Sequence, residues 1–257
     1  SCALPLAVLK LRRLWCSREW QDISDVLHPG HIHDDTLKAQ TVARVLDAAE
    51  CPPTYSTDPE RVRAVIAGGY GAMFAAVEGA EDDRSLGAND LKALHLTEDD
   101  SVVGIAASGR TPYVLGALDY AKSVGALTIA VTCCPGCAAE AHADIAISPA
   151  PGPEVITGST RMKSGTAQKM ILNMLSTGVM VKLGKVYGNL MVDVKASNEK
   201  LRERCVRIVR QATGAEDAAA RAALIETNYA CKPAIVMLLL GVDKTGAETL
   251  LTRANGR

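Results

Sequence analysis

One loop of this chain, residues 106–112, has the composition of an anion-binding site and reads Ala-Ala-Ser-Gly-Arg-Thr-Pro. The apolar, β-branched residues 101–106 predict a buried strand, and Pro112 is typical of the first turn of a helix. A turn from strand into helix presents unpaired backbone N–H groups and the positive end of the helix dipole. In an open α/β sheet, such a site lies beyond the carboxyl ends of the strands.

Four consecutive residues of this loop are the candidate ligand-binding residues. Ser108 and Thr111 contribute hydroxyls, Gly109 lets a ligand approach the backbone closely, and Arg110 lies between them. The pattern matches neither the G-x-G-x-x-G nor the P-loop signature, which disfavours dinucleotides and nucleoside triphosphates. We predict a phosphate or carboxylate site here, and an ordinary capped turn is the alternative.

A second cluster of polar residues, residues 158–169, reads GSTRMKSGTAQK and begins a long helix. Basic residues in the first turn of a helix oppose its dipole, which indicates a ligand or an acidic partner that compensates them. Ser159, Arg161 and Lys163 are therefore candidate anion-binding residues. A solvated helix start is the alternative.

Two carboxylates are candidates for acid and base chemistry. Glu50 precedes a rigid Cys-Pro-Pro turn, and Glu81 lies in the acidic run EGAEDD, residues 78–83. Two carboxyl groups in different environments are the usual means of running acid and base steps at neutral pH. Taken singly, each is also explained as a solvated surface charge.

Two other motifs are set aside. Residues 134–137 have the C-x-x-C spacing of redox proteins, but no thioredoxin-like helix accompanies them. His31 and His33 with two following aspartates could bind a metal, although a loose polar loop explains them as well. The chain has no G-x-S-x-G motif for a hydrolase triad, and we predict neither a metal nor a cofactor.

Alternation of strands and helices predicts an α/β fold with a parallel sheet flanked by helices. The predicted strands are residues 62–67, 101–106, 127–132 and 143–148. The predicted helices are residues 72–79, 112–124, 162–183, 198–211, 217–229, 233–240 and 244–254. We divide the chain into an atypical N-terminal segment (1–43), an α/β domain (44–200) and a C-terminal helical subdomain (201–257).

Composition excludes several classes of protein. The 257 residues carry a net charge of −1 and are 4% aromatic, which argues against a nucleic-acid partner. No apolar run approaches the ~18–20 residues that span a bilayer, so we expect no membrane association. Eight cysteines in a chain of this length fit a reducing cytoplasm better than a disulfide framework.

Several segments together resemble bacterial N-acetylmuramic acid 6-phosphate etherases, which belong to the sugar isomerase (SIS) superfamily. They are LDAAECPPTY (46–55), AVEGAEDD (76–83), DLKALHLTEDDSVVGIAASGRTPYVLGAL (90–118) and GSTRMKSGTAQKMILNMLSTGVMVKLGKVYGNLMVDVKASNEKL (158–201). The resemblance covers about four-fifths of the chain. Eukaryotic glucokinase regulatory protein is a more distant relative.

The resemblance implies a SIS-type αβα sandwich and a cofactor-free carbon–oxygen lyase of amino-sugar recycling. Such an enzyme cleaves the D-lactyl ether of N-acetylmuramic acid 6-phosphate to give N-acetylglucosamine 6-phosphate and D-lactate. Glu50 matches the general acid, Glu81 matches the second catalytic carboxylate, the C2 base, and residues 108–111 match a sugar-phosphate loop. The resemblance also implies a homodimer with its sites near the subunit interface, in keeping with the apolar helix 162–183.

The N-terminal segment departs from this family. Family members carry a strand and a G-A-G-T-S-G-R loop before the L-D-A-x-E segment, where residues 35–44 of this chain read DTLKAQTVAR. The missing strand lies inside the sheet, so its neighbours need a backbone partner, and residues 3–9 are the candidate substitute. A sugar-phosphate-binding regulatory protein without turnover, an inactive truncated etherase and an aldose–ketose isomerase are the alternatives.

Overall fold

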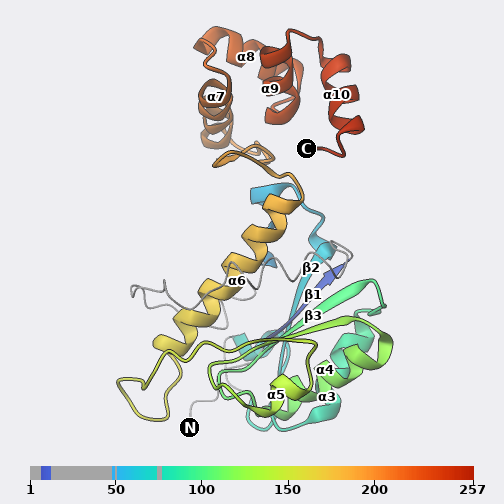
Figure 1. Ribbon diagram of the computed structural model, residues 1–257, viewed down its shortest axis with the longest axis vertical. Coiled ribbons are helices and arrows are strands. Elements are labelled where there is room, and N and C mark those ends of the chain that lie inside the picture. The colour runs from blue at the N-terminus through green and yellow to red at the C-terminus, as the bar shows by residue number, and fades with distance from the viewer. Residues whose placement is uncertain (1–6, 13–47, 50, 74–76) are drawn as a thin grey trace. The chain divides into compact units, whose positions relative to one another are not determined.

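A computed structural model of the chain describes residues 7–12, 48–49, 51–73 and 77–257 (Figure 1). The chain divides into two compact units. Ser1–Ala49 and Pro59–Leu175 form the first, which we call the sheet unit; Glu50–Asp58 and Ser176–Arg257 form the second, which we call the helical unit. The boundary between these units, after Leu175, lies earlier in the chain than the boundary at residue 200 that the sequence pattern predicts.

The sheet unit contains a five-stranded sheet of order β2-β1-β3-β4-β5 (Figure 1). Its strands are β1 (Ala7–Arg12), β2 (Val62–Ile66), β3 (Asp100–Ile105), β4 (Leu127–Val131) and β5 (Ile145–Ile147). β3 and β4 pair in parallel with Val103 opposite Ile129, and β4 pairs in parallel with β5. The four strands predicted from the sequence are all present, and the α/β fold with a parallel sheet flanked by helices is confirmed.

β1 is the exception, because it is antiparallel to both of its neighbours. Leu9 lies opposite Ala64 of β2 on one side and opposite Val103 of β3 on the other. The backbone of β1 therefore supplies partners to both strands, and β2 and β3 run in the same direction although they do not touch. This strand overlaps the end of the segment proposed as a substitute, residues 3–9; residues 3–6 lie outside the described part of the chain.

The helices of the sheet unit begin and end at residues suited to their termini. They are η2 (Pro59–Arg61), η3 (Tyr70–Met73), α3 (Arg84–Ala93), α4 (Pro112–Val124), α5 (Ala138–Ala141) and the first part of α6 (Lys163–Lys182). The Asp83 side chain accepts a hydrogen bond from the Ser85 N–H at 2.7 Å and so caps α3. α4 starts with Pro112 and ends at Gly125, which adopts a φ of 88°.

The predicted helix over residues 72–79 is wrong for the residues described. Only the short 3-10 helix η3 forms there, and residues 78–82 are turns. Gly79 has a φ of 79°, a left-handed conformation that ends any helix. Residues 74–76 lie outside the described part of the chain.

α3 and α4 lie side by side and cover the sheet (Figure 1). Their backbones approach closely at two glycines: a Cβ on Gly87 would lie 2.0 Å from the Tyr113 carbonyl oxygen, and one on Gly116 would lie 2.0 Å from that of Arg84. Arg84 also pairs with Asp119. The buried core beneath includes Leu91, Val102, Tyr113, Val114, Leu118 and Ala130.

In its described residues, the helical unit contains the segment 51–58, of which 51–55 are helical, together with the end of α6, a short hairpin and four further helices. The hairpin is β6 (Val186–Tyr187) with β7 (Leu190–Met191), and the helices are α7 (Glu199–Thr213), α8 (Asp217–Glu226), α9 (Cys231–Leu240) and α10 (Lys244–Arg253). The predicted C-terminal helices are thus confirmed, with ends shifted by a few residues. Their buried side chains include Cys205, Val206, Val209, Leu224, Cys231 and Ile235.

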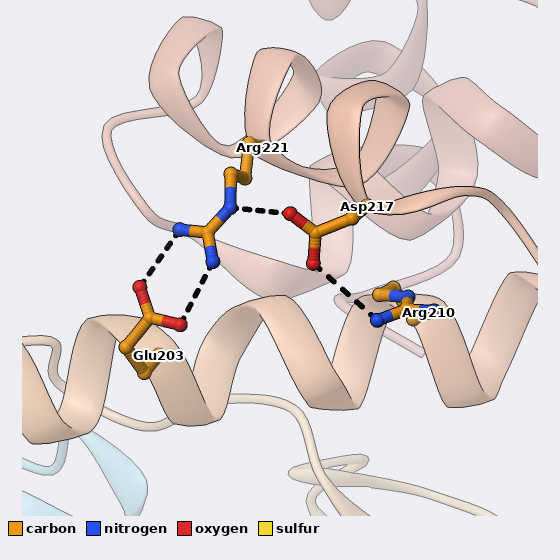
Figure 2. A network of polar contacts seen from close by, with 4 residues as sticks. All are labelled: Glu203, Arg210, Asp217 and Arg221. Atoms are coloured by element: carbon orange, nitrogen blue, oxygen red, sulfur yellow. Dashed lines mark hydrogen bonds and ion pairs between the residues drawn. The ribbon is translucent and has the colours of Figure 1, made fainter.

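Charged side chains link α7 to α8 (Figure 2). The Arg221 guanidinium donates to both carboxylate oxygens of Glu203, at 2.7 and 2.8 Å, and to Asp217 at 2.6 Å. Arg210 donates to the other oxygen of Asp217 at 3.3 Å. These bonds to Arg221 lower the pKa of both carboxyl groups.

Candidate active site

A cavity of about 250 Å³ lies in the sheet unit, where β3 and β4 end and α6 begins. Its wall is formed by Ala107, Ser108, Cys133, Gly152, Pro153, Glu154, Thr157, Gly158, Ser159, Thr160 and Ser164. Ala107 and Ser108 follow β3, and Cys133 follows β4. The cavity is therefore at the carboxyl edge of parallel strands, where an α/β sheet places its ligands.

The Ser108 loop is fixed by backbone hydrogen bonds. The Cys133 N–H donates to the Ala107 carbonyl oxygen at 2.9 Å, and the Ala139 N–H donates to that of Gly109 at 2.9 Å. Ser108 Oγ accepts only a long bond, 3.4 Å, from the Arg110 N–H. Backbone hydrogen bonds of the loop, rather than those of the Ser108 side chain, therefore fix the position of the Ser108 hydroxyl on the cavity wall.

Gly109 is required by the packing of the chain itself. It is buried with a φ of 61°, and a Cβ there would lie 2.0 Å from Cys137 Sγ. Its N–H donates to the Ala106 carbonyl oxygen at 3.1 Å. The expected role of Gly109, to let a ligand approach the backbone, stays a prediction.

A carboxylate that the sequence analysis did not select, Glu154, lies on the same wall. Its two oxygens accept the N–H groups of Lys163 and Ser164, the first two residues of α6, each at 3.1 Å. Glu154 thus places a negative charge at the positive end of this helix, and the compensation of the basic side chains by a ligand or an acidic partner stays a prediction. The sequence signal was weak, because the carboxylate and the amides are nine and ten residues apart.

The residues of the second predicted cluster divide between the cavity and the surface. Ser159 lines the cavity, and its Oγ accepts the Arg161 N–H at 3.4 Å. Lys163 takes part through its backbone N–H, and Arg161 is exposed. Neither of these two basic side chains is among the residues of the cavity wall.

Glu81 is anchored at the start of α4, the helix that follows the Ser108 loop. Its carbonyl oxygen accepts the Tyr113 N–H at 3.0 Å, and its side chain is half-buried. The buried Tyr113 hydroxyl donates to Asp90 of α3 at 2.6 Å; burial, with this bond, raises the tyrosine's pKa. The backbones of Glu81 and the Ser108 loop are therefore both held at the first turn of α4. Glu50, the other predicted catalytic carboxylate, lies outside the described residues.

The other motifs of the sequence are placed as follows. Cys134 and Cys137 are free thiols, and Cys137 occupies the N-cap position of α5 without a side-chain bond to the helix. Across the described ranges, no three histidine, cysteine or acidic side chains form a group that could hold a metal ion. His31 and His33 lie outside those ranges. None of the helices in the described ranges has the length and apolar character needed to cross a bilayer.

Comparison with known proteins defines the class. Residues 37–122 match the glucokinase regulatory protein N-terminal SIS domain, and residues 188–239 match the C-terminal lid domain of glucokinase regulatory protein. The fold and these matches define a SIS-domain protein that carries a helical lid-type domain. The first match spans the Ser108 loop and Glu81, and the second begins at the hairpin of the helical unit.

Curated relatives narrow the class to one family. Over 212 residues, 82% of this chain, it is 57% identical to N-acetylmuramic acid 6-phosphate etherase 1 of Vibrio cholerae and 59% identical to the etherase of Serratia proteamaculans, covering 71% of each. The etherase of Clostridium botulinum is 58% identical over the same length, with 70% of that protein covered. The chain belongs to the N-acetylmuramic acid 6-phosphate etherase family.

Proposed function

We propose that this chain is a carbon–oxygen lyase that acts on N-acetylmuramic acid 6-phosphate in amino-sugar recycling. It converts this sugar phosphate and water into N-acetylglucosamine 6-phosphate and D-lactate. The observation that carries the proposal is the cavity at the carboxyl edge of β3 and β4, with Ser108 on its wall and the Glu81 backbone bonded to the first turn of the next helix. Family membership supplies the substrate class.

Residues 108–111 bind the 6-phosphate in this proposal. The Ser108 hydroxyl and the loop amides other than those of Gly109 and Arg110, which already donate within the loop, donate to phosphate oxygens, while the dipole of α4 favours the negative charge. Ser159, which also lines the cavity, is a further donor in this proposal. The rigid backbone of the loop means that little ordering is needed when the ligand arrives.

Glu81 and Glu50 divide the proton transfers. The sugar opens to its aldehyde, which acidifies the C2 proton, and the Glu81 carboxylate removes that proton. The electron pair forms the C2–C3 double bond as the C3–O bond breaks, and Glu50 protonates the departing D-lactate oxygen. Water then adds at C3 and a proton returns to C2, so that the balance is one water consumed per lactate released.

The test is release of D-lactate from N-acetylmuramic acid 6-phosphate by the purified chain. We expect Glu81→Gln to lower the rate by about 10²–10⁴-fold, since general-base catalysis contributes that much. Glu78→Gln, at an exposed carboxylate three residues away in the same turn, is the matched control and should retain the rate. Saturable binding with no lactate from the unmodified chain would instead indicate a sugar-phosphate-binding regulatory protein or an inactive etherase.

We also propose that the chain is a homodimer of the cytoplasm. Val155 and Ile156, which follow Glu154 in the sequence, are 77% and 73% exposed, and exposed apolar residues of this size are typical of interfaces. Met170, in the part of α6 that belongs to the sheet unit, adds exposed apolar surface. Buried free thiols such as Cys205 and Cys231 fit a reducing compartment.

Sedimentation equilibrium tests the dimer. Ile156→Lys combined with Met170→Lys should shift the mass from two chains to one. Ile225→Lys introduces one such charge at a residue of the helical unit that is 68% exposed, and should leave the mass unchanged. A single-chain mass for the unmodified protein would overturn this part of the proposal.

A further inference from the structure

The cavity wall contains two places where a helix start could hold an anion. The first is the Ser108 loop, which leads into α4 and which the proposed function assigns to the sugar phosphate. The second is the start of α6, a helix of 20 residues whose first two N–H groups point at Glu154. Ser164, the donor of one of these amides, also lines the cavity.

The second place is already filled by an anion from the chain. Each oxygen of the Glu154 carboxylate accepts one amide N–H at 3.1 Å, so the negative charge lies against the positive end of the α6 dipole. A phosphate oxygen would make the same two bonds if the carboxylate were absent. The side chain is half-buried and forms part of the wall that also holds Ser108.

We propose that Glu154 is a positioning residue that keeps anions away from the start of α6 and so leaves the Ser108 loop as the one place for the phosphate. The inference rests on the proposed function for the identity of the ligand. The substrate in that function carries a phosphate and a lactyl carboxylate, both negative. Because Glu154 blocks the start of α6 to both groups, the phosphate binds in this cavity at the Ser108 loop alone. The C2–C3 region of the sugar is then held in one orientation.

The proposed role of Glu154 differs from that of an ordinary helix cap. A cap stabilises the helix, and its loss lowers stability without changing what the cavity binds. A carboxylate that excludes anions has a second effect: its removal creates a new anion site of two free amides and a helix dipole. Anion stoichiometry is therefore a readout that a purely structural role would not change.

The test is calorimetric titration with inorganic phosphate, which needs no turnover. The unmodified chain should bind one phosphate per chain, and Glu154→Ala should bind two. Ser108→Ala in the Glu154→Ala background should abolish the first site and keep the second. Asp243→Ala is the matched control, because Asp243 caps α10 in the helical unit by accepting the Gly246 N–H at 2.8 Å; it should lower stability without adding a phosphate.

Glu154→Gln covers the case in which the alanine variant does not fold. The amide keeps one acceptor for the α6 start and removes the negative charge, so inorganic phosphate should bind at the Ser108 loop about tenfold more tightly and inhibit lactate release more strongly. Unchanged stoichiometry in Glu154→Ala, or unchanged phosphate affinity in Glu154→Gln where only that variant folds, would overturn the proposal. Absence of lactate with these binding changes intact would reject the proposed reaction alone.

Discussion

Each of the two units of this chain is stabilised by a different kind of internal contact. In the sheet unit, some glycines lie so close to neighbouring atoms that no larger residue fits. A Cβ on Gly116 or on Gly109 would lie 2.0 Å from another atom. In the helical unit, Gly214 and Gly241 end helices with open space around them. Helix caps and charge pairs supply the polar contacts there; the pairs of Arg221 with Glu203 and Asp217 are exposed, whereas those of Asp193 with Lys185 and Lys232 are largely buried.

This difference matters for function because the candidate site belongs to the tightly packed unit. The Ser108 loop, the Glu81 turn and the start of α4 are positioned by backbone hydrogen bonds and by close helix crossing, which tolerate little change. Contacts between exposed long side chains can rearrange at small cost. Substitutions of similar chemistry should therefore have unequal effects in the two units, and the predictions that follow test that inequality from its largest effect to its smallest.

Gly116→Ala should have the largest effect on stability. The new Cβ would lie 2.0 Å from the Arg84 carbonyl oxygen, so α3 and α4 must separate, and we expect a loss of about 3 kcal/mol in urea denaturation. Gly71→Ala is the control: a Cβ there meets nothing within 4 Å, and its stability should be unchanged or slightly higher. Equal stability of the two variants would show that the helix crossing is looser than described.

Gly109→Ala should have a smaller effect on stability and a specific effect on binding. Alanine at a φ of 61° costs about 1–2 kcal/mol, and contact with Cys137 displaces the Ser108 loop. Gly136→Ala carries the strain of a φ of 76° with nothing within 4 Å, so it isolates the backbone cost. We expect the KM for the sugar phosphate to rise in Gly109→Ala and to stay unchanged in Gly136→Ala. A raised KM in both variants would mean that the Cys137 contact does not position the loop.

Much of this site could be predicted from the sequence because its signals are local. Pro112 and the apolar run before it mark the turn that carries Ser108, and α4 has the bounds predicted for it. The carboxylate at the start of α6, Glu154, was not predicted, since its bonds to the helix amides depend on how the intervening loop folds.

The remaining features depend on contacts distant in the sequence. The reason for a glycine at residue 109 is its contact with Cys137, and the anchor of Glu81 is the N–H of Tyr113. β1 pairs with two strands that lie far along the chain, and its antiparallel direction has no local signal. Periodicity locates elements, whereas tertiary packing decides these partners.

Tyr113→Phe tests a buried polar contact of the sheet unit. The phenol donates to Asp90 at 2.6 Å from a fully buried side chain, and its removal leaves the Asp90 carboxylate with one donor fewer. We expect a loss of about 1.5 kcal/mol in urea denaturation. Tyr187→Phe, at an exposed tyrosine of the hairpin, is the control and should be neutral. Equal losses would remove the distinction between buried and exposed polar groups.

Arg221→Met should have the smallest effect, although Figure 2 shows Arg221 at the centre of the charge network. All its partners are half-exposed, so solvent screens the pairs and the loss at pH 7 should be smaller than in Tyr113→Phe. Arg204→Met, at an exposed arginine of α7 outside the drawn network, is the control and should lose less still.

The stability difference between the unmodified chain and Arg221→Met should decrease as the pH falls. Arg221 lowers the pKa of Glu203 below its ordinary 4.5 and that of Asp217 below its ordinary 3.8. Groups with a lowered pKa in the folded state contribute stability above their unfolded pKa and lose it as the pH falls through the folded value. The difference between the unmodified chain and Arg221→Met should therefore be constant near neutrality, shrink below pH 4.5 and vanish in stronger acid. A difference that persists in acid would assign the role of Arg221 to packing of its aliphatic part, which would make the helical unit more like the sheet unit.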